Sequence, residues 1–189
     1  DNIVGEQFNK KVLEISSHIS TIIMRDIKNY IDSTISGNKM KCKFFVLDST
    51  KNFDEVDNHE SQDKYDEWKL ATKNPFNMVV CNFAFHYFLE NNLTVRQAIS
   101  NVVNNLDINS RFIITILDGK EIMSKIDDKQ EIIGMKNGMA IWKIKKKYSI
   151  NSLENNEKSL GQQINVSLSS TGEEHPEYLL IGILILCII

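Results

Sequence analysis

Apolar and polar positions follow one another along the chain in blocks that predict both helices and strands. Over residues 7–35, apolar side chains recur every three to five positions, which predicts a long amphipathic helix with one buried face. Residues 42–47 form a short apolar run that stops at polar residues 48–50, and residues 76–81 form a second run that ends at Asn82. Both runs predict buried parallel strands.

The middle of the chain continues this alternation. Residues 52–67 are polar and predict a surface loop that leads into a short helix around Trp68. Thr94 is expected to cap a further helix, and a third apolar run at 112–117 ends at Asp118. Strand, helix and strand in this order predict a doubly wound α/β sheet, in which ligands bind at the carboxyl ends of the strands.

Beyond Lys120 the pattern changes to shorter apolar runs separated by polar connections. Runs at 142–147, 164–169 and 177–180 predict strands of an antiparallel extension. The length of 189 residues and the absence of a linker segment predict one domain over residues 1–189. The chain begins without methionine and ends in an apolar tail, expected to be a strand, so both ends look cut.

The charge of the chain limits how it can bind nucleic acid. A formal net charge of -3 argues against a broad basic surface that grips phosphates, so a nucleic acid would be recognised locally. A cluster of lysines, at position 143 and at 145–147, has two interpretations. It either meets RNA phosphates or protects an exposed strand edge.

Candidate chemistry lies at the predicted ligand-binding edge. Residues 82–88 place aromatic and polar rings directly after a buried strand, where they either stack on a flat ligand such as a purine or fill the core. Asp48 follows the neighbouring run and either accepts a hydrogen bond from an adenine amino group or caps the next turn. The sequence contains no glycine-rich phosphate loop and no nucleophile elbow, which disfavours kinases and hydrolases.

Several motifs occur in a recognisable order. The segment PFNMVVCNFAFHY at 75–87 and the segment FIITILDGK at 112–120 resemble two signatures of mRNA cap guanine-N7 methyltransferases. The elements IWKIKKKY at 141–148, SLG at 159–161 and PEYL at 176–179 follow in the order of that family. The IWKI and SLG elements are most similar to the methyltransferase domain of capping enzymes from large DNA viruses of the giant-virus and poxvirus kind.

The resemblance implies a class I, Rossmann-like methyltransferase fold and an activity. The expected reaction transfers a methyl group from the cofactor S-adenosylmethionine to N7 of the cap guanine. Because N7 carries a lone pair and no proton, in-line attack needs no general base, which suits a chain without an evident acid–base pair.

The resemblance also implies site residues. Asp48, with Ser49 beside it, corresponds to the acidic position that contacts the adenine of S-adenosylmethionine, and Asn82 and Phe83 are expected beside the same cofactor. His86 and Tyr87 resemble residues that line the cap guanine pocket. Glu177 resembles the carboxylate that reads the N1 and N2 edge of the guanine.

The chain departs from the family at both ends. Residues 12–17 are similar to the family's opening strand but lack the glycines of the cofactor loop, and they fit the predicted helix better. The loop, its strand and the ribose-binding acid are therefore expected upstream of Asp1, so that the fold is incomplete at the N-terminus. Residues 181–189 do not resemble the family's continuation.

The resemblance also implies partners and a location, and two alternative functions stay open. The expected partners are the capped 5′ end of mRNA and either triphosphatase and guanylyltransferase domains of the same polypeptide or a stimulatory subunit, with no membrane. The expected location is the host cytoplasm, in virus factories, and the virion. One alternative is a non-catalytic methyltransferase-like subunit or remnant that binds or stimulates, and another is a class I methyltransferase for a different base or a small molecule.

Overall fold

The computed structural model of the chain describes residues 12–15, 43, 45–154, 156–169 and 172–180. The chain divides into two compact units, which are described separately here. Unit 1 comprises residues 1–84 and 100–114, and unit 2 comprises residues 85–99 and 115–189. The single domain over residues 1–189 stays a prediction.

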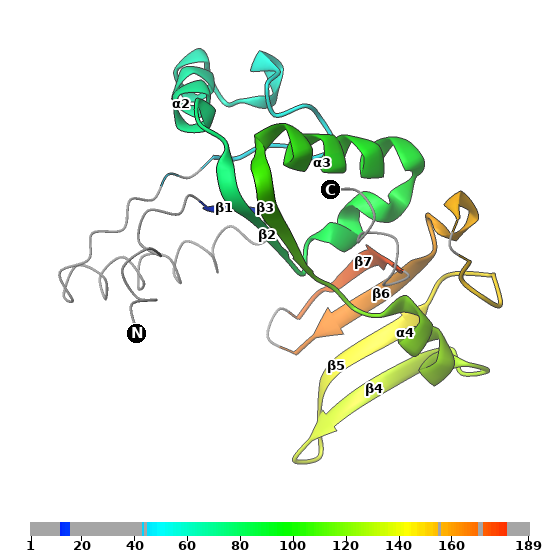
Figure 1. The fold of residues 1–189 in the computed structure, drawn as a ribbon. Coiled ribbons are helices and arrows are strands. Elements are labelled where there is room, and N and C mark those ends of the chain that lie inside the picture. The colour runs from blue at the N-terminus through cyan, green and yellow to red at the C-terminus, as the bar shows by residue number, and fades with distance from the viewer. Residues whose placement is uncertain (1–11, 16–42, 44, 155, 170–171, 181–189) are drawn as a thin grey trace, which may run out of the picture. The chain divides into compact units, whose positions relative to one another are not determined.

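Unit 1 is built on a three-stranded sheet with the order β1-β2-β3 (Figure 1). The strands are β1 (Val12–Ile15), β2 (Phe76–Asn82) and β3 (Leu106–Thr115), the last residue of which belongs to unit 2. β1 and β2 run parallel, with Leu13 opposite Val79. A parallel pair whose strands are far apart in sequence is the arrangement expected of an α/β, Rossmann-like fold.

The second predicted strand is confirmed by β2. Val79 and Cys81 are fully buried, and Cys81 is not part of a disulfide. These two side chains lie on one face of the strand, and Phe76, on the other face, is also buried, as expected of a strand with packing on both faces. The third predicted strand is also present, but its bounds differ. β3 begins six residues before the apolar run at 112–117 and ends at Thr115, two residues before the end of that run.

The predicted helix over residues 7–35 is wrong at Val12–Ile15, which form a strand. The spacing of Val12 and Ile15 fits a helical stripe, but pairing with β2 satisfies the backbone of this β-branched segment. The rest of the predicted helix lies outside the described residues. The expectation of an opening strand upstream of Asp1 relied on the helical interpretation and loses that support.

The predicted strand at 42–47 is also wrong, because residues 43 and 45–47 have no strand structure. Val46 is 52% exposed, and the ring of Phe45 packs edge-on against Trp68 at a centroid distance of 5.3 Å. Side-chain packing therefore holds this segment, and none of its described residues pairs with a neighbouring strand.

The predicted helix around Trp68 is confirmed as α2 (Gln62–Thr72), which follows a short 3-10 helix, η2 (Val56–Asn58). α2 starts at Ser61, whose side chain accepts a hydrogen bond from the Lys64 N–H. An N-cap of this kind satisfies one of the backbone donors that the first turn leaves free.

The next helix is α3 (Asn92–Asn105), and its cap differs from the prediction. Asn91 Oδ1 accepts hydrogen bonds from the N–H groups of Leu93 and Thr94, and the Thr94 hydroxyl accepts one from the Asn91 N–H. This reciprocal arrangement is a capping box in which Asn91 is the cap and Thr94 its partner in the first turn.

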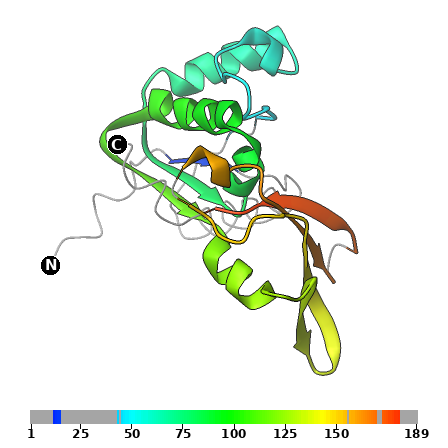
Figure 2. The same cartoon turned by 90° about the vertical axis from the view of Figure 1, so that its right-hand side faces the viewer.

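Unit 2 contains a four-stranded antiparallel sheet with the order β4-β5-β6-β7. The strands are β4 (Glu131–Lys136), β5 (Met139–Lys146), β6 (Gln163–Leu168) and β7 (Glu174–Tyr178). The predicted antiparallel extension is therefore confirmed. β4 and the helix α4 (Gly119–Ile126), which packs on the sheet beside β4, were not predicted (Figures 1 and 2).

The core of unit 2 lies between α4 and this sheet. It is apolar, and its buried members are Ile122, Ile126, Ile144, Tyr148, Leu153, Ile164, Val166 and Leu179. α4 begins at Asp118, whose side chain accepts hydrogen bonds from the Lys120 and Glu121 N–H groups. None of the helices among the described residues is long and apolar enough to cross a bilayer.

The lysines of β5 do not protect an exposed edge, so that interpretation is wrong. β5 lies between β4 and β6, and two of its lysines pair with acids of the same sheet, Lys143 with an acid on the adjacent β4 and Lys145 with an acid on β7, two strands away. Lys145 Nζ lies 3.0 Å from Glu174 Oε1, and Lys143 Nζ lies 3.9 Å from Glu131 Oε2. Cross-strand pairs of opposite charge contribute modestly to sheet pairing.

In unit 2, the backbone at Gly119 lies close to the backbone of Leu180. Its N–H donates a 2.8 Å hydrogen bond to the Leu180 carbonyl, and a Cβ at this position would lie 2.6 Å from the same oxygen. The backbone of Leu180 also forms an isolated parallel bridge with Asp118. Residues 181–189, which include most of the apolar tail, lie outside the described part of the chain.

Replacing Gly119 with alanine is expected to lower the free energy of unfolding by about 1–3 kcal/mol, because backbone atoms must move to admit the methyl group. Urea denaturation of Gly119→Ala and of Lys120→Ala, an exposed neighbour, tests this. Equal midpoints for the two variants would contradict the close approach.

Candidate functional site

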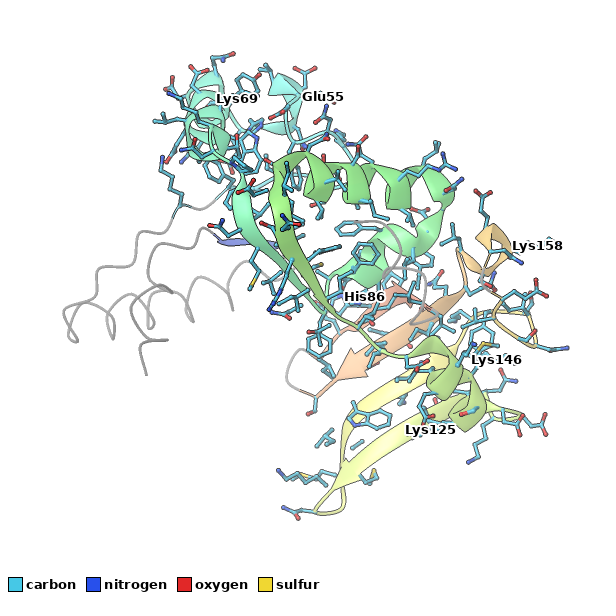
Figure 3. The ribbon with its side chains drawn as sticks, in the orientation of Figure 1. Glu55, Lys69, His86, Lys125, Lys146 and Lys158 are labelled. Carbon is cyan, nitrogen blue, oxygen red and sulfur yellow. The ribbon has the colours of Figure 1, made fainter. Side chains whose placement is uncertain are left out.

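His86 and Glu177 lie close together in unit 2. His86 is in the first turn of the 3-10 helix η3 (Phe85–Glu90), directly after β2, and Glu177 is in β7. η3 packs against β7, which brings His86 Nδ1 to 3.7 Å from Glu177 Oε2. The two side chains are only 5% and 15% exposed. His86 is labelled in Figure 3.

Tyr87 completes this group of predicted guanine-binding residues. Its ring centroid lies 4.1 Å from that of His86, with the ring planes tilted by 58°. The structure therefore brings together three of the residues singled out in the sequence, from segments 90 positions apart. We call His86, Tyr87 and Glu177 the guanine-side cluster.

The SLG element predicted from the sequence holds η3 in place. The Gly161 N–H donates a 2.8 Å hydrogen bond to the Leu89 carbonyl, at the end of η3. A Cβ on Gly161 would lie 3.0 Å from the carbonyl oxygen of Glu90. The preceding Ser159 ends the short 3-10 helix η4 (Glu157–Ser159) and bonds the backbone of Glu154 through its hydroxyl.

The guanine-side cluster has unusual electrostatics. Burial raises the pKa of the Glu177 carboxyl from its usual value to about 7. A carboxyl group with this pKa changes charge near neutral pH. It can accept hydrogen bonds from a ligand when ionised and donate one when protonated.

Asp48 and Ser49 belong to unit 1, in a turn after the segment 45–47. Asp48 Oδ1 accepts hydrogen bonds from the Thr50 N–H at 2.9 Å and from the Thr50 hydroxyl at 2.6 Å. The hydrogen bond from the Thr50 hydroxyl holds the pKa of the exposed Asp48 carboxyl below its usual value. Asp48 therefore caps this turn through Oδ1, and its contact with adenine stays a prediction.

Asn82 and Phe83 lie at the carboxyl end of β2, also in unit 1. Phe83 has a φ of +50°, and its side chain is 57% exposed. A left-handed conformation costs a residue other than glycine about 1–2 kcal/mol. The bend thus places an exposed aromatic ring at the end of a parallel strand, the edge where α/β sheets bind ligands.

The core interpretation of the aromatic segment holds for two other rings. Phe85 and Phe88 are buried and pack edge-on at a centroid distance of 5.7 Å. Of the Phe rings in this segment, Phe83 alone is exposed. The predicted site residues therefore divide between the units: the guanine-side cluster is in unit 2, and Asp48, Ser49, Asn82 and Phe83 are in unit 1.

Two residues near Asp48 were missed in the sequence. Asn58 and Asn101 are buried, and their side-chain amides bond the backbone of the Asp48 turn. The available signal was the position of Asn101, three residues after Ala98 and directly before Val102, on the apolar stripe of α3. A polar residue on such a stripe is expected to have hydrogen-bond partners.

Comparison with known proteins identifies the family. Residues 11–184 match the model of the mRNA (guanine-N(7))-methyltransferase domain. The chain belongs to this family. The match covers most of the chain, including β1 and the guanine-side cluster, and confirms the family that the sequence motifs indicated. No curated protein matches the chain.

Glu177 is expected to make the stability of this methyltransferase-family chain depend on pH. Because its pKa is about 7 in the fold and near 4.5 in the unfolded chain, the fold binds the proton more tightly between these values. Stability from this group is present below pH 4.5 and is lost as the pH rises to 7. Glu177→Gln should therefore be about 2 kcal/mol more stable than the wild type at pH 8 and similar at pH 4.

The measurement is urea denaturation across pH 4–8. Glu174→Gln is the matched control, since Glu174 lies on the same strand but is exposed and faces Lys145. A difference between wild type and Glu177→Gln that is constant with pH would contradict the raised pKa.

Proposed function

We propose that this chain transfers a methyl group from S-adenosylmethionine to N7 of the guanine at the 5′ cap of mRNA. The family match supports methyl transfer in mRNA capping. The observation that carries the specific activity is the guanine-side cluster, in which a partly buried carboxylate lies beside the His86 ring and that ring lies against Tyr87.

The guanine-side cluster suits the chemistry of a guanine base. The ionised Glu177 carboxylate can accept hydrogen bonds from guanine N1–H and the 2-amino group at once, a bidentate arrangement. Methylation at N7 puts positive charge on the ring, and a partly buried carboxylate stabilises that charge more than water does. His86 and Tyr87 provide ring surfaces for the base.

The Asp48 turn and Phe83 suit the adenosine part of the methyl donor. No hydrogen-bond donor among the described residues reaches Asp48 Oδ2, so this oxygen can accept a hydrogen bond from the adenine 6-amino group. The exposed Phe83 ring offers a face for stacking. When bound, S-adenosylmethionine supplies the methyl group on a sulfonium, which guanine N7 attacks in line with the methyl–sulfur bond.

No residue of the chain needs to remove a proton, because N7 carries none. The task of the residues is to hold the guanine ring in one orientation, and positioning of this kind lowers barriers by several kcal/mol. The proposed partner is the capped 5′ end of mRNA. Further capping domains, a stimulatory subunit and a place in the cytoplasm of a virus-infected host are proposals of the same kind.

The activity is tested by incubating the chain with S-adenosylmethionine and RNA that carries an unmethylated guanosine cap. The nucleosides are then identified by mass spectrometry. N7-methylguanosine supports the proposal. Binding of cap analogue without methyl transfer would favour the non-catalytic alternative, and methylation of another base or of a small molecule would favour the second one.

Glu177→Gln is expected to lower kcat/KM for capped RNA by about tenfold at pH 8, because the amide cannot accept both guanine donors. The KM for S-adenosylmethionine should stay unchanged. Glu174→Gln is the control on the same strand. Equal activities for the two variants would remove Glu177 from guanine recognition.

The affinity for unmethylated cap analogue should also depend on pH. With a pKa of about 7, the ionised fraction of Glu177 rises about tenfold between pH 6 and pH 8, so the affinity should rise with it. Titration calorimetry at both pH values measures this change. Glu177→Gln should show a flat profile, and a wild-type affinity that falls with pH would contradict the role of the carboxylate.

A further inference from the structure

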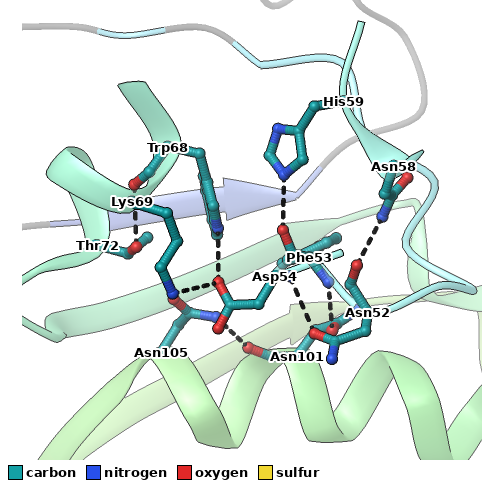
Figure 4. Close-up of polar contacts among 10 residues, drawn as sticks. All are labelled: Asn52, Phe53, Asp54, Asn58, His59, Trp68, Lys69, Thr72, Asn101 and Asn105. Atoms are coloured by element: carbon teal, nitrogen blue, oxygen red, sulfur yellow. Dashed lines mark hydrogen bonds and ion pairs between the residues drawn. The ribbon is translucent and has the colours of Figure 1, made fainter. Parts of the chain in front are cut away.

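The turn that carries Asp48 is held by side-chain amides rather than by a strand ladder. Asn101, in α3, makes three hydrogen bonds to the backbone of this turn, and Figure 4 shows the one with Phe53. Asn101 Oδ1 accepts from the Phe53 N–H at 3.1 Å, and Nδ2 donates to the carbonyls of Ser49 and Lys51 at 3.1 Å and 2.7 Å.

Asn58, five residues after the end of this turn, also holds it through its side-chain amide. Its Oδ1 accepts from the Asp48 N–H at 2.8 Å, and its Nδ2 donates to the carbonyls of Asp48 and Asn52 at 3.0 Å and 3.1 Å. Two carboxamides thus bond backbone groups of five of the six residues at 48–53. All of these residues belong to unit 1.

Burial of the side-chain amides favours one set of hydrogen bonds between them and the turn. Asn101 is 1% exposed, and a buried carboxamide costs free energy unless its hydrogen bonds are made. A shift of the turn would break several of these bonds together. The turn therefore has one favoured conformation, fixed by residues that do not themselves reach its outer surface.

The consequence for Asp48 is a fixed direction for its carboxylate. The backbone of Asp48 is held on both sides by Asn58, and its Oδ1 is held by Thr50. No donor from the described part of the chain reaches the remaining oxygen, Oδ2, and we assign this oxygen to the ligand. A carboxylate held in this way accepts a hydrogen bond from an adenine 6-amino group but repels the 6-carbonyl oxygen of hypoxanthine.

We propose that Asn101 and Asn58 are positioning residues that hold the Asp48 turn so that it selects the adenine base of the methyl donor. This inference rests on the proposed function, because it assigns Asp48 to adenine. Asn101 and Asn58 touch neither substrate, but the selection of adenine over other bases depends on them.

The first test compares Asn101→Ala with Asn105→Ala. Asn105 is also buried in α3, but its Nδ2 donates to the Asn101 carbonyl within the helix and not to the turn. Asn101→Ala should raise the KM for S-adenosylmethionine about tenfold, with kcat and the affinity for cap analogue unchanged. Asn105→Ala should lower stability without this change in KM. Equal KM values for the two variants would overturn the proposal.

The second test measures base selectivity, which a general loss of stability would not alter. The probes are S-adenosylhomocysteine and its hypoxanthine analogue. The wild type should prefer the adenine compound by about tenfold, and Asn101→Ala and Asn58→Ala should both reduce that preference. Unchanged preference in both variants would overturn the proposal.

Hydrogen exchange separates failure of this inference from failure of the proposed function. In the full chain without ligand, the Phe53 amide should exchange faster in Asn101→Ala than in Asn105→Ala. Unchanged exchange would show that Asn101 does not hold the turn and would overturn the inference. A wild type that binds neither probe would overturn the proposed function and the adenine-selecting role with it.

Discussion

Removal of polar side chains from water is the constraint on which both groups of predicted site residues depend. Glu177 lies beside His86 with little access to solvent, and its carboxyl therefore holds a proton up to about pH 7. Asn101 is buried more deeply, and hydrogen bonds to a loop backbone offset the cost of its burial. In each case the cost of removing the polar group from water limits the partners and the arrangement that the group can have.

The contacts that position the predicted site residues form two separate groups along the chain. The contacts that position His86, Tyr87 and Glu177 are within unit 2, from the SLG element to β7. The contacts that position Asp48 are within unit 1. Each group of residues is therefore organised by its own local core and its own hydrogen bonds.

Much of the fold was predictable because its signal is local. β2 contains a short apolar run bounded by polar residues, and β6 alternates polar with apolar residues, and both patterns predict a strand directly. The family motifs pointed to His86 and Glu177 for the same reason, since each lies within a short matched segment. The contact between them still had to come from the structure.

The failures involve contacts that no local pattern reports. Val12–Ile15 fits a helical stripe as well as a strand, and only pairing with β2 decides between them. Residues 45–47 have the composition of a strand, yet Phe45 packs on Trp68 and no described residue pairs with them. Asn101 was overlooked because its partners lie about 50 positions away.

The backbone at Phe83 limits which residues could replace it over evolution. A φ of +50° excludes proline, whose ring fixes φ near −65°, and strongly disfavours valine, isoleucine and threonine. Glycine and asparagine would relieve the strain but would remove the ring. A lineage that keeps both the bend and an aromatic surface is therefore left with few side chains, all unbranched at Cβ, and this position should drift slowly even though it lies outside the core.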